Sequence, residues 1–253
     1  MQPLSITPRL RQQLAEWLQE DLGRGDLSAP ALQGVEGVAH CVAKAPGVFC
    51  GGVLVEPLLR ELVNGQHHCS VEGLVSEGVS VEAGDVLLQL RGSAETLVAL
   101  ERTALNLAMR LSGIATATAA LVAQLEGTGV GLADTRKTTP GLRVLEKYAV
   151  RMGGGSNHRM GLWDAAMIKD NHVLVAGSVA EAVQREARHD VQVPEHLADG
   201  HAAPVHRVDA VVTAERHRAR RQTKLLPLRQ EGDLALVHAV ALLRAVLHGD
   251  ADV

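Results

Sequence analysis

The spacing of apolar residues predicts a helix near the N-terminus of the chain. Thr7 is a suitable N-cap, Pro8 suits the first helical position, and Gly23 is a suitable end. Between them, apolar residues recur at the spacing of one helix face, at Leu10, Leu14, Trp17 and Leu18. We interpret the turn-rich segment 21–28 as the connection between this helix and the first strand.

Short apolar runs separated by glycine-containing turns dominate residues 38–90. We predict a helix over 53–63 and short strands over 38–43, 71–74, 79–81 and 86–90. This pattern favours a small sheet domain. His67 and His68 are predicted to be exposed loop residues, because no nearby residue completes a metal site with them.

A longer apolar helix face follows Ser93, which can act as its cap. The apolar positions of this face are Leu97, Leu100, Leu107 and Leu111. We expect Gly113 to end the helix, and a second helix rich in Ala and Thr to run to about residue 125. Arg102 projects from the middle of the first helix. On periodicity alone, we expect it to be solvated or paired with a carboxylate.

Residues 130–187 alternate between strand and helix patterns. We predict buried strands over 130–133 and 165–169, a helix over 141–152, and a further helix opened by Ser178 and Glu181. Leu142, Leu145 and Ala149 are expected to face inward. Charged residues follow both predicted strands. This alternation is typical of an α/β barrel, in which active sites lie at the carboxyl ends of the strands.

The composition excludes several classes of protein. The chain has 253 residues, enough for one large or two modest domains. A net charge of −4 and an aromatic content of 2% argue against nucleic-acid binding and against coating of an anionic membrane. Neither a signal peptide nor an apolar run long enough to span a membrane is evident. Cys41, Cys50 and Cys69 are predicted to be reduced thiols in a cytoplasmic protein.

Cationic side chains are concentrated between residues 134 and 172. They are Arg136, Lys137, Arg143, Lys147, Arg151, Arg159 and Lys169, with His158 and His172 beside them. Folded together, they would form a pocket for a ligand with several negative charges. The run 153–155, Gly-Gly-Gly, could let backbone N–H groups approach a phosphate. The alternative is a surface of ion pairs with the four carboxylates of this stretch, Asp134, Glu146, Asp164 and Asp170.

The stretch DTRKTTPGLRVLEKYAVRMGGGSNHRMGLWDAAMIKDNH resembles the signature of the quinolinate phosphoribosyltransferase family. ERTALNLAMRLSGIAT and EDLGRGDLS match that family as well, and the resemblance covers about residues 5–187. It implies an α/β fold with a small N-terminal α/β sandwich and an open α/β barrel, here incomplete in its C-terminal half. The domains implied are 1–112 for the sandwich, 113–188 for the first half of the barrel, and 189–253 for a divergent tail.

The resemblance also implies a reaction and a set of residues for it. Quinolinate and phosphoribosyl pyrophosphate would give nicotinate mononucleotide, pyrophosphate and CO2 with Mg2+, in a homodimer or higher homo-oligomer. The residues implied for substrate binding are Arg102, Thr135, Arg136, Lys137, His158, Arg159 and Lys169. Arg102 would serve the neighbouring subunit's pocket. Lys137 and Lys169 are the implied catalytic residues, and no metal ligand is assigned.

The family's later motifs are not found beyond residue 188. Seven of the twelve histidines lie from His189 onward, at spacings that fit no compact metal motif. The basic segment 215–224 is interpreted as solvated or disordered, and 233–248 as an apolar helix. We hypothesise that 189–253 is a frame-shifted or otherwise replaced C-terminus. Turnover is then expected to be weak or absent. Two alternatives to the transferase function remain open. The chain could be a remnant that only binds dicarboxylate or oligomerises, or a related phosphoribosyltransferase that acts on another acceptor.

Overall fold

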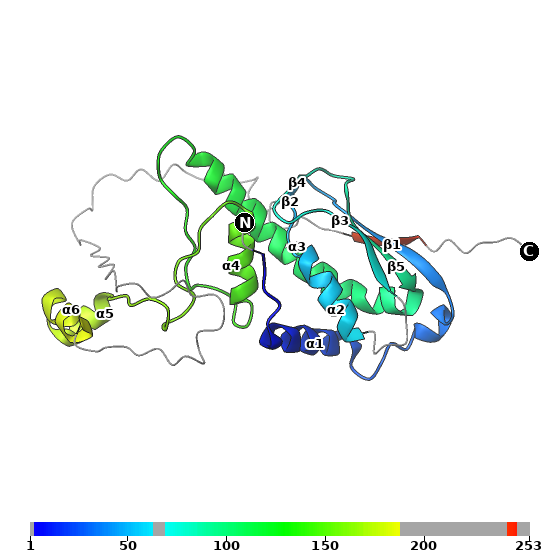
Figure 1. Ribbon diagram of the computed structural model, residues 1–253, viewed down its shortest axis with the longest axis horizontal. Coiled ribbons are helices and arrows are strands. Elements are labelled where there is room, and N and C mark those ends of the chain that lie inside the picture. Colours follow the sequence, from blue (N-terminus) through cyan, green and yellow to red (C-terminus); the bar gives the residue numbers. More distant parts are fainter. Residues whose placement is uncertain (1–2, 63–68, 188–241, 247–253) are drawn as a thin grey trace, which may run out of the picture. The chain divides into compact units, whose positions relative to one another are not determined.

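The computed structural model describes residues 3–62, 69–187 and 242–246. These residues form two compact units (Figure 1). The first contains the described residues up to Asp134, together with 138–157 and 242–246. The second contains 135–137 and 158–187. The predicted tail over 189–253 therefore lies largely outside the described residues, as do His67 and His68.

A four-stranded antiparallel sheet organises the first unit, with the strand order β3-β5-β1-β6. Its strands are β1 (Glu36–Val42), β3 (Ser70–Leu74), β5 (Val86–Ser93) and β6 (Leu242–Val246). A separate pair consists of β2 (Gly47–Val48) and β4 (Ser80–Val81). Burial alternates along β1, as expected for a strand with one face on the core. The strands predicted over 38–43, 71–74, 79–81 and 86–90 are confirmed within one or two residues at most boundaries.

Strand β6 corrects one prediction from the sequence. An apolar helix was expected over 233–248, but Leu242–Val246 is a strand that pairs antiparallel with β1. A strand edge offers a row of unpaired N–H and C=O groups, so an apolar segment beside it gains main-chain hydrogen bonds as a strand. Periodicity within the segment carries no information about this partner. The remaining residues of the predicted helix lie outside the described part of the chain.

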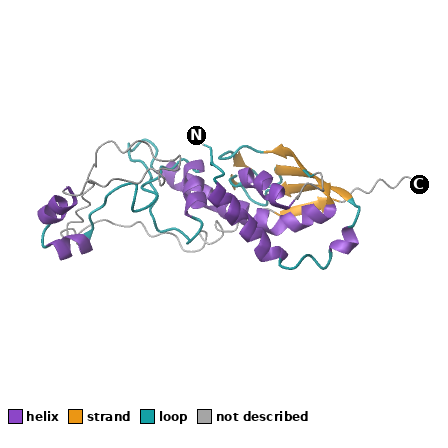
Figure 2. Ribbon diagram, turned by 60° about the horizontal axis from the view of Figure 1, so that its bottom comes forward, coloured by secondary structure: helices purple, strands orange, loops and turns teal. Residues whose placement is uncertain are grey.

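Helices cover the sheet of the first unit, as Figure 2 shows. They are α1 (Pro8–Leu22), α2 (Val55–Leu62), α3 (Ala94–Gln124) and α4 (Arg143–Met152), with short 3-10 turns at Ala29–Leu32 and Gly52–Leu54. The predicted caps are confirmed: the hydroxyl of Thr7 accepts the N–H of Leu10 at 3.2 Å, and Ser93 accepts that of Thr96 at 3.3 Å. Segment 21–28 does connect α1 to the sheet.

One continuous hydrophobic core joins these helices to the sheet. Leu14, Leu58, Leu90, Leu100 and Leu111 are each at most 1% exposed. Burying one such side chain contributes about 1.5–3 kcal/mol. The helix faces predicted from leucine spacing are the faces that pack here, which explains why α1, α2 and α3 form where the sequence indicated.

Helix α3 runs without a break through Gly113, contrary to the prediction that this glycine ends a helix. A glycine inside a helix costs only about 1 kcal/mol relative to alanine, and Leu111 and Ala115 on either side are buried. Packing therefore outweighs propensity at this position. By length and composition α3 could also cross a membrane, which is weak support for a membrane span because its apolar face belongs to the core.

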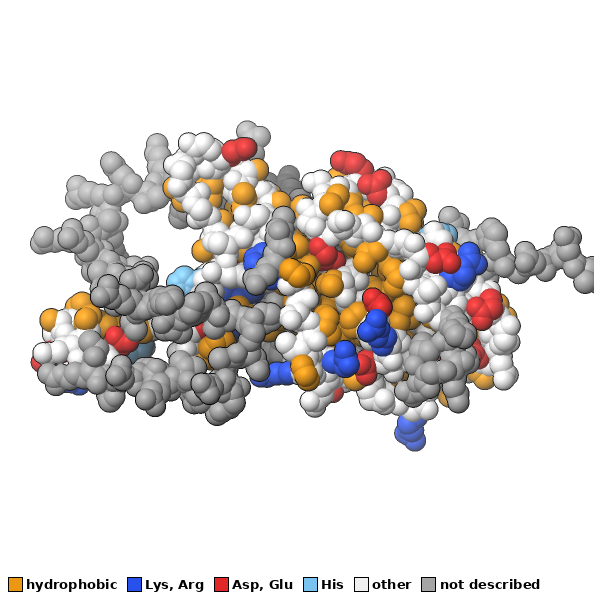
Figure 3. All heavy atoms as spheres, viewed as in Figure 1, with side chains coloured by type: hydrophobic (Ala, Val, Ile, Leu, Met, Phe, Trp, Pro, Cys, Tyr) orange, Lys and Arg blue, Asp and Glu red, His pale blue; other side chains and the backbone are white. Residues whose placement is uncertain are grey.

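The second unit contains α5 (Asp170–Ala176) and α6 (Val179–Ala187). Ser178 caps α6 as predicted, since its hydroxyl accepts the N–H of Glu181 at 3.1 Å. Among the described residues of this unit, the buried core centres on Ile168, Ala176 and Ala182. Leu174 and Val175 of α5 are 80% and 81% exposed, and hydrophobic side chains are visible at this position in Figure 3.

The two strands predicted for the barrel, 130–133 and 165–169, do not form. Ala133 makes a single isolated parallel bridge to Ser156, and Val130 is 61% exposed. Parallel strands are normally buried by neighbours on both sides, and no further parallel strand lies beside these segments among the described residues. The chain is a mixed α/β protein, and the barrel remains an expectation from the resemblance.

Candidate active site

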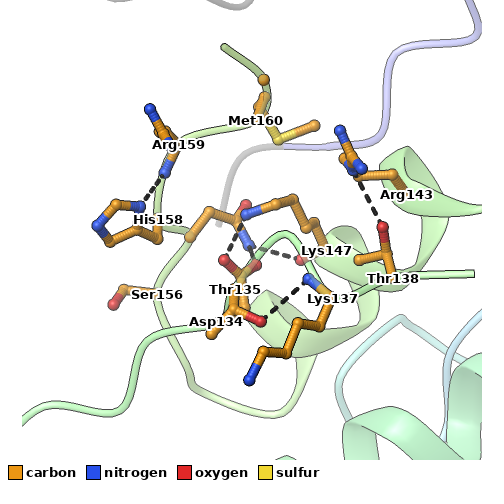
Figure 4. Close-up of polar contacts among 12 residues, drawn as sticks. Asp134, Thr135, Lys137, Thr138, Arg143, Lys147, Ser156, His158, Arg159 and Met160 are labelled. Atoms are coloured by element: carbon orange, nitrogen blue, oxygen red, sulfur yellow. Dashed lines mark hydrogen bonds and ion pairs between the residues drawn. The ribbon is translucent and has the colours of Figure 1, made fainter. Parts of the chain in front are cut away.

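The first predicted site segment, Thr135–Lys137, is a tight turn. The hydroxyl of Thr135 accepts the backbone N–H of Lys137 at 3.1 Å (Figure 4). Such a bond fixes the backbone locally and needs no regular secondary structure. Lys137 is exposed and Arg136 is half-buried. The turn therefore holds two cations next to each other in a defined backbone conformation.

The second predicted segment contains His158 and Arg159. The Nδ1 atom of His158 accepts the backbone N–H of Arg159 at 2.7 Å. A neutral imidazole that accepts at Nδ1 carries its proton on Nε2, so this ring has a donor at its other nitrogen. The guanidinium of Arg159 donates to the carbonyl of Ala165 at 2.7 Å. Arg159 is thus anchored through one arm and retains further N–H donors for a ligand.

Lys169 is the last predicted site residue of the second unit and directly precedes α5. Its backbone N–H donates to Nδ1 of His172 at 3.0 Å, which orders the first turn of that helix. The side chain of the preceding residue, Ile168, is buried in the core of the unit. Burial of Ile168 therefore fixes the backbone from which Lys169 extends to the surface.

The structure groups almost all of the predicted site residues into one compact unit. Thr135, Arg136 and Lys137 share the second unit with His158, Arg159 and Lys169, although residues 138–157 separate the two stretches in sequence. If these cations face one pocket, their mutual repulsion would favour an anionic ligand. The structure places the backbone of all six residues in the same unit.

Arg102 lies in the first unit, on α3, and is about half exposed. It pairs with its neighbour Glu101, as expected for an arginine on a helix surface. A groove of the same unit runs beside it, bordered by Trp17, Asp21 and Arg110 among others. Its role in the substrate pocket of a neighbouring subunit remains a prediction.

Three cations of the stretch are engaged within the first unit. They lie on α4: Arg143 donates to the hydroxyl of Thr138 at 3.0 Å, Arg151 lies 5.6 Å from the ring centre of Tyr148, and Lys147 is buried. The interpretation that all seven cations face one pocket is therefore wrong for Lys147. Helix α4 forms as predicted, with Leu145 and Ala149 in the core.

The carboxylates of the stretch also have specific partners. Glu146 accepts from Nε of Arg110 at 3.0 Å, and Arg110 lies outside the stretch. Asp164 accepts the backbone N–H groups of Met160 and Gly161. These contacts do not neutralise the predicted site cations. They weaken the alternative in which the stretch is a plain surface of ion pairs.

The glycine run 153–155 has a structural role, contrary to the prediction that its N–H groups approach a phosphate. The three N–H groups donate to the carbonyls of Ala149, Arg151 and Val150, each at 3.0 Å, and so complete the end of α4. A Cβ atom on Gly153 would lie 2.3 Å from the carbonyl oxygen of Ala115 in α3. Close packing of two helices, and not phosphate binding, requires glycine here.

Asp134, Lys147 and Asn157 form a polar cluster that the prediction of a cationic pocket did not anticipate. Lys147 forms an ion pair with Asp134 (Figure 4), and its side chain is 1% exposed. Asn157 donates to Asp134 at 2.6 Å and to the carbonyl of Lys147 at 2.8 Å. A signal was available, because Lys147 lies between the inward positions Leu145 and Ala149 of a predicted helix, where a charge needs a buried partner.

Cys41, Cys50 and Cys69 are free thiols, and the first two are buried. Burial raises the pKa of the Cys41 thiol to about 11, so this thiol stays protonated at neutral pH. Burial, with the carboxylate of Glu77 beside it, also raises the pKa of Cys50. Among the residues that the structure describes, no group of three or more His, Cys, Asp or Glu side chains could hold a metal ion.

Two family models match the chain. The N-terminal domain of quinolinate phosphoribosyl transferase matches residues 26–112, and its C-terminal domain matches residues 114–211. The second match continues beyond Arg188, so the family pattern extends past the last motif found by inspection. Residues 189–211 lie outside the described part of the chain.

Individual relatives agree with the family models. A probable carboxylating nicotinate-nucleotide pyrophosphorylase of Bacillus subtilis is 44% identical over 70% of this chain, and one of Synechocystis is 47% identical over 68%. The matched regions span 61% and 57% of those two proteins.

Solved structures give the same result at the level of the fold. A NadC of Streptococcus pyogenes is 36% identical with a TM-score of 0.68, covering 74% of this chain and 66% of the other. The nicotinate-nucleotide pyrophosphorylase of Francisella tularensis is 34% identical with a TM-score of 0.67, covering 76% of this chain and 68% of the other. Sequence motifs, fold and relatives lead to one conclusion: the chain belongs to the quinolinate phosphoribosyltransferase family.

Proposed function

We propose that this protein transfers the phosphoribosyl group of phosphoribosyl pyrophosphate to quinolinate, with decarboxylation, in the biosynthesis of NAD. The products are nicotinate mononucleotide, pyrophosphate and CO2. The proposal is supported by family membership and, above all, by one structural observation. Every predicted substrate-binding residue except Arg102 lies in the same compact unit.

The cations of that unit suit an aromatic dicarboxylate. Guanidinium groups bind carboxylates through paired N–H donors, while ammonium groups supply a compact charge. In this proposal Arg136, His158, Arg159 and Lys169 hold the two carboxylates. Lys137 lies between the quinolinate and the phosphoribosyl group, where Thr135 shapes the turn and contacts the substrate.

The reaction follows from this arrangement. With the dicarboxylate held, the pyridine nitrogen attacks C1 of the ribose while pyrophosphate departs, and fixed cations reduce the entropic cost of this alignment. The ring nitrogen then carries a positive charge. The adjacent carboxylate leaves as CO2, and the electron pair of the broken C–C bond stays on the ring carbon beside that charge. This carbon then takes up a proton from water, which gives nicotinate mononucleotide. Lys137 and Lys169 act here as the catalytic cations, because a fixed positive charge stabilises the negative charge that develops during the reaction.

Mg2+, the assembly and the compartment belong to the same proposal. Mg2+ commonly enters such sites on substrate phosphates with few protein ligands. It would supply charge stabilisation to the departing pyrophosphate. We further propose a cytoplasmic homo-oligomer, at least a dimer, in which Arg102 completes the neighbouring pocket.

Calorimetric titration tests the acceptor. We expect quinolinate to bind much more tightly than nicotinate, which lacks one carboxylate. Arg159→Ala should weaken quinolinate roughly 10- to 100-fold, since a hydrogen bond to a charged group contributes about 1.5–3 kcal/mol. Arg185→Ala on α6 is the matched control and should bind like the wild type. Equal affinities for quinolinate and nicotinate in the wild type would contradict the proposal.

A second candidate function is binding of the dicarboxylate without transfer. The matched regions span only 61% and 57% of two relatives, so binding is the smaller of the two claims. A steady-state assay with quinolinate, phosphoribosyl pyrophosphate and Mg2+ separates the two. Equimolar release of pyrophosphate and CO2 supports transfer, whereas tight quinolinate binding without product supports the binding function.

A further inference from the structure

The polar cluster of Asp134, Lys147 and Asn157 lies at both points where the chain leaves the first unit. Asp134 directly precedes the segment 135–137, and Asn157 directly precedes the segment 158–187. Both following segments carry predicted substrate-binding residues. The side chains of Asp134 and Asn157 nevertheless meet, with a hydrogen bond of 2.6 Å between them.

Main-chain hydrogen bonds also connect the two segments that end at Asp134 and Asn157. The N–H of Asp134 donates to the carbonyl of Ser156 at 3.1 Å, and the N–H of Ser156 donates to that of Leu132 at 2.9 Å. Ala133 and Ser156 form the isolated parallel bridge. A single bridge without further strand pairing is weak, since a short pair of strands has little stability of its own. Side-chain contacts are therefore needed to hold the two segments in register.

Lys147 cannot itself bind the substrate. Its side chain is 1% exposed, and its charge is paired with Asp134, whose side chain is 7% exposed. Asn157 closes the cluster by donating both to that carboxylate and to the backbone carbonyl of Lys147. One amide group thus connects helix α4, through its backbone, with the end of the segment that precedes Thr135.

A buried ion pair is a poor means of stabilising a fold, because desolvation offsets much of the attraction between the charges. Well-packed apolar residues would stabilise this junction at least as well. What an ion pair and an amide provide in addition is a directed geometry. Such a geometry fixes the positions from which the segments after Asp134 and after Asn157 begin.

We propose that Asp134, Lys147 and Asn157 are positioning residues for the dicarboxylate site. They set the separation between the cations that follow Asp134 and those that follow Asn157. This inference rests on the proposed function. The cluster acts through Arg136, Lys137, His158 and Arg159 and makes no contact of its own with the ligand.

Asn157→Ala is the primary test, because Asn157 is exposed and its loss leaves the core intact. We expect the Kd for quinolinate to rise roughly 10- to 100-fold, as small misplacements of binding groups cause losses of this size. The calorimetric stoichiometry should stay that of the wild type. A merely structural role would lower the fraction of competent protein, and hence the stoichiometry, and leave the Kd unchanged.

Ser156→Ala provides a matched control. Ser156 is the adjacent exposed residue, and its hydroxyl also makes one hydrogen bond, to the carbonyl of Leu132 at 3.0 Å. It should bind quinolinate like the wild type. The double variant Asp134→Asn/Lys147→Met removes both buried charges together, avoids an uncompensated ion, and should weaken binding to a similar extent as Asn157→Ala.

The outcomes separate the two levels of the proposal. If the wild type prefers quinolinate and both cluster variants bind it with the wild-type Kd, the positioning role is refuted and the proposed function stands. If the wild type shows no preference for quinolinate, the proposed function fails and this inference fails with it.

Discussion

Glu146 shows how one side chain in this family signature serves the fold and not the ligand. Burial acts to raise its pKa, but hydrogen bonds from Arg110 and Thr139 outweigh that effect and hold the pKa below its ordinary value. The carboxylate bridges α3 and α4, since Arg110 belongs to α3 and Glu146 to α4. Glu146 therefore links two helices of the first unit.

A dependence of stability on pH follows from this lowered pKa. The charged form of Glu146 stabilises the folded state above about pH 4.3, the ordinary pKa of a glutamate, and that contribution is lost as the pH falls through the lower folded value. Glu146→Gln should lower the free energy of unfolding by about 1–3 kcal/mol at pH 6 and by clearly less at pH 3. Urea unfolding at both pH values measures the difference.

Glu56→Gln is the control for this pair of measurements. Glu56 pairs with Arg60 on the exposed face of α2, and both side chains are more than 60% exposed. Such pairs contribute little, so this variant should change stability by less than about 0.5 kcal/mol at either pH. If Glu146→Gln lowered the free energy of unfolding equally at both pH values, the glutamate would stabilise the fold through packing and not through its charge.

At the scale of elements, α3 and α4 pack so closely that they decide where glycine is required. Gly153 at the end of α4 faces the backbone of α3, whereas Gly113 inside α3 has open space at its Cβ position. The two glycines occur in different segments that match the family, and the sequence alone does not distinguish their roles. Their roles differ because the backbone of α3 lies close to Gly153, whereas no atom lies within 4 Å of the Cβ position of Gly113.

This contrast predicts opposite effects of the same substitution. Gly153→Ala forces a Cβ to 2.3 Å from the carbonyl oxygen of Ala115 and should destabilise by about 1–3 kcal/mol or more. Gly113→Ala should stabilise by up to about 1 kcal/mol, because alanine is the better helix former. Thermal unfolding of both variants provides the measurement. Loss of stability in Gly113→Ala would indicate a partner covering this face of α3.

At the scale of the whole molecule, the two compact units differ in how much core they contain. The first has a continuous core across its sheet and helices, whereas the second is held by a cluster around Ile168, Ala176 and Ala182. Local opening costs less free energy where few apolar contacts are broken. We therefore expect the second unit, which contains most of the proposed substrate-binding residues, to open more readily than the first.

Native-state hydrogen exchange should show this difference directly. Amides of α5 and α6 are expected to exchange at least about tenfold faster than those of α3, and saturating quinolinate should slow the exchange at Lys137, Arg159 and Lys169. Uniform protection across both units would refute the first expectation. Ligand protection confined to the first unit would refute the second.

The sequence by itself determined the local elements and the family of this protein. Leucine spacing and caps placed α1, α2, α4 and most strands, because a buried helix or strand face imprints its period on the chain. The motifs from Asp134 to His172 were specific enough to identify the family. They also named side chains that the fold then brought into one unit.

Only the tertiary structure decided the rest, because it depends on contacts between residues far apart in sequence. The pairing of β6 with β1, the continuity of α3 through Gly113, and the packing of Gly153 on α3 are all decided by a neighbour that periodicity does not record. The same holds for Lys147, which the charge pattern assigned to a pocket. Its buried ion pair with Asp134 depends on the contact between α4 and the segment that ends at Asp134, which the charge pattern does not encode.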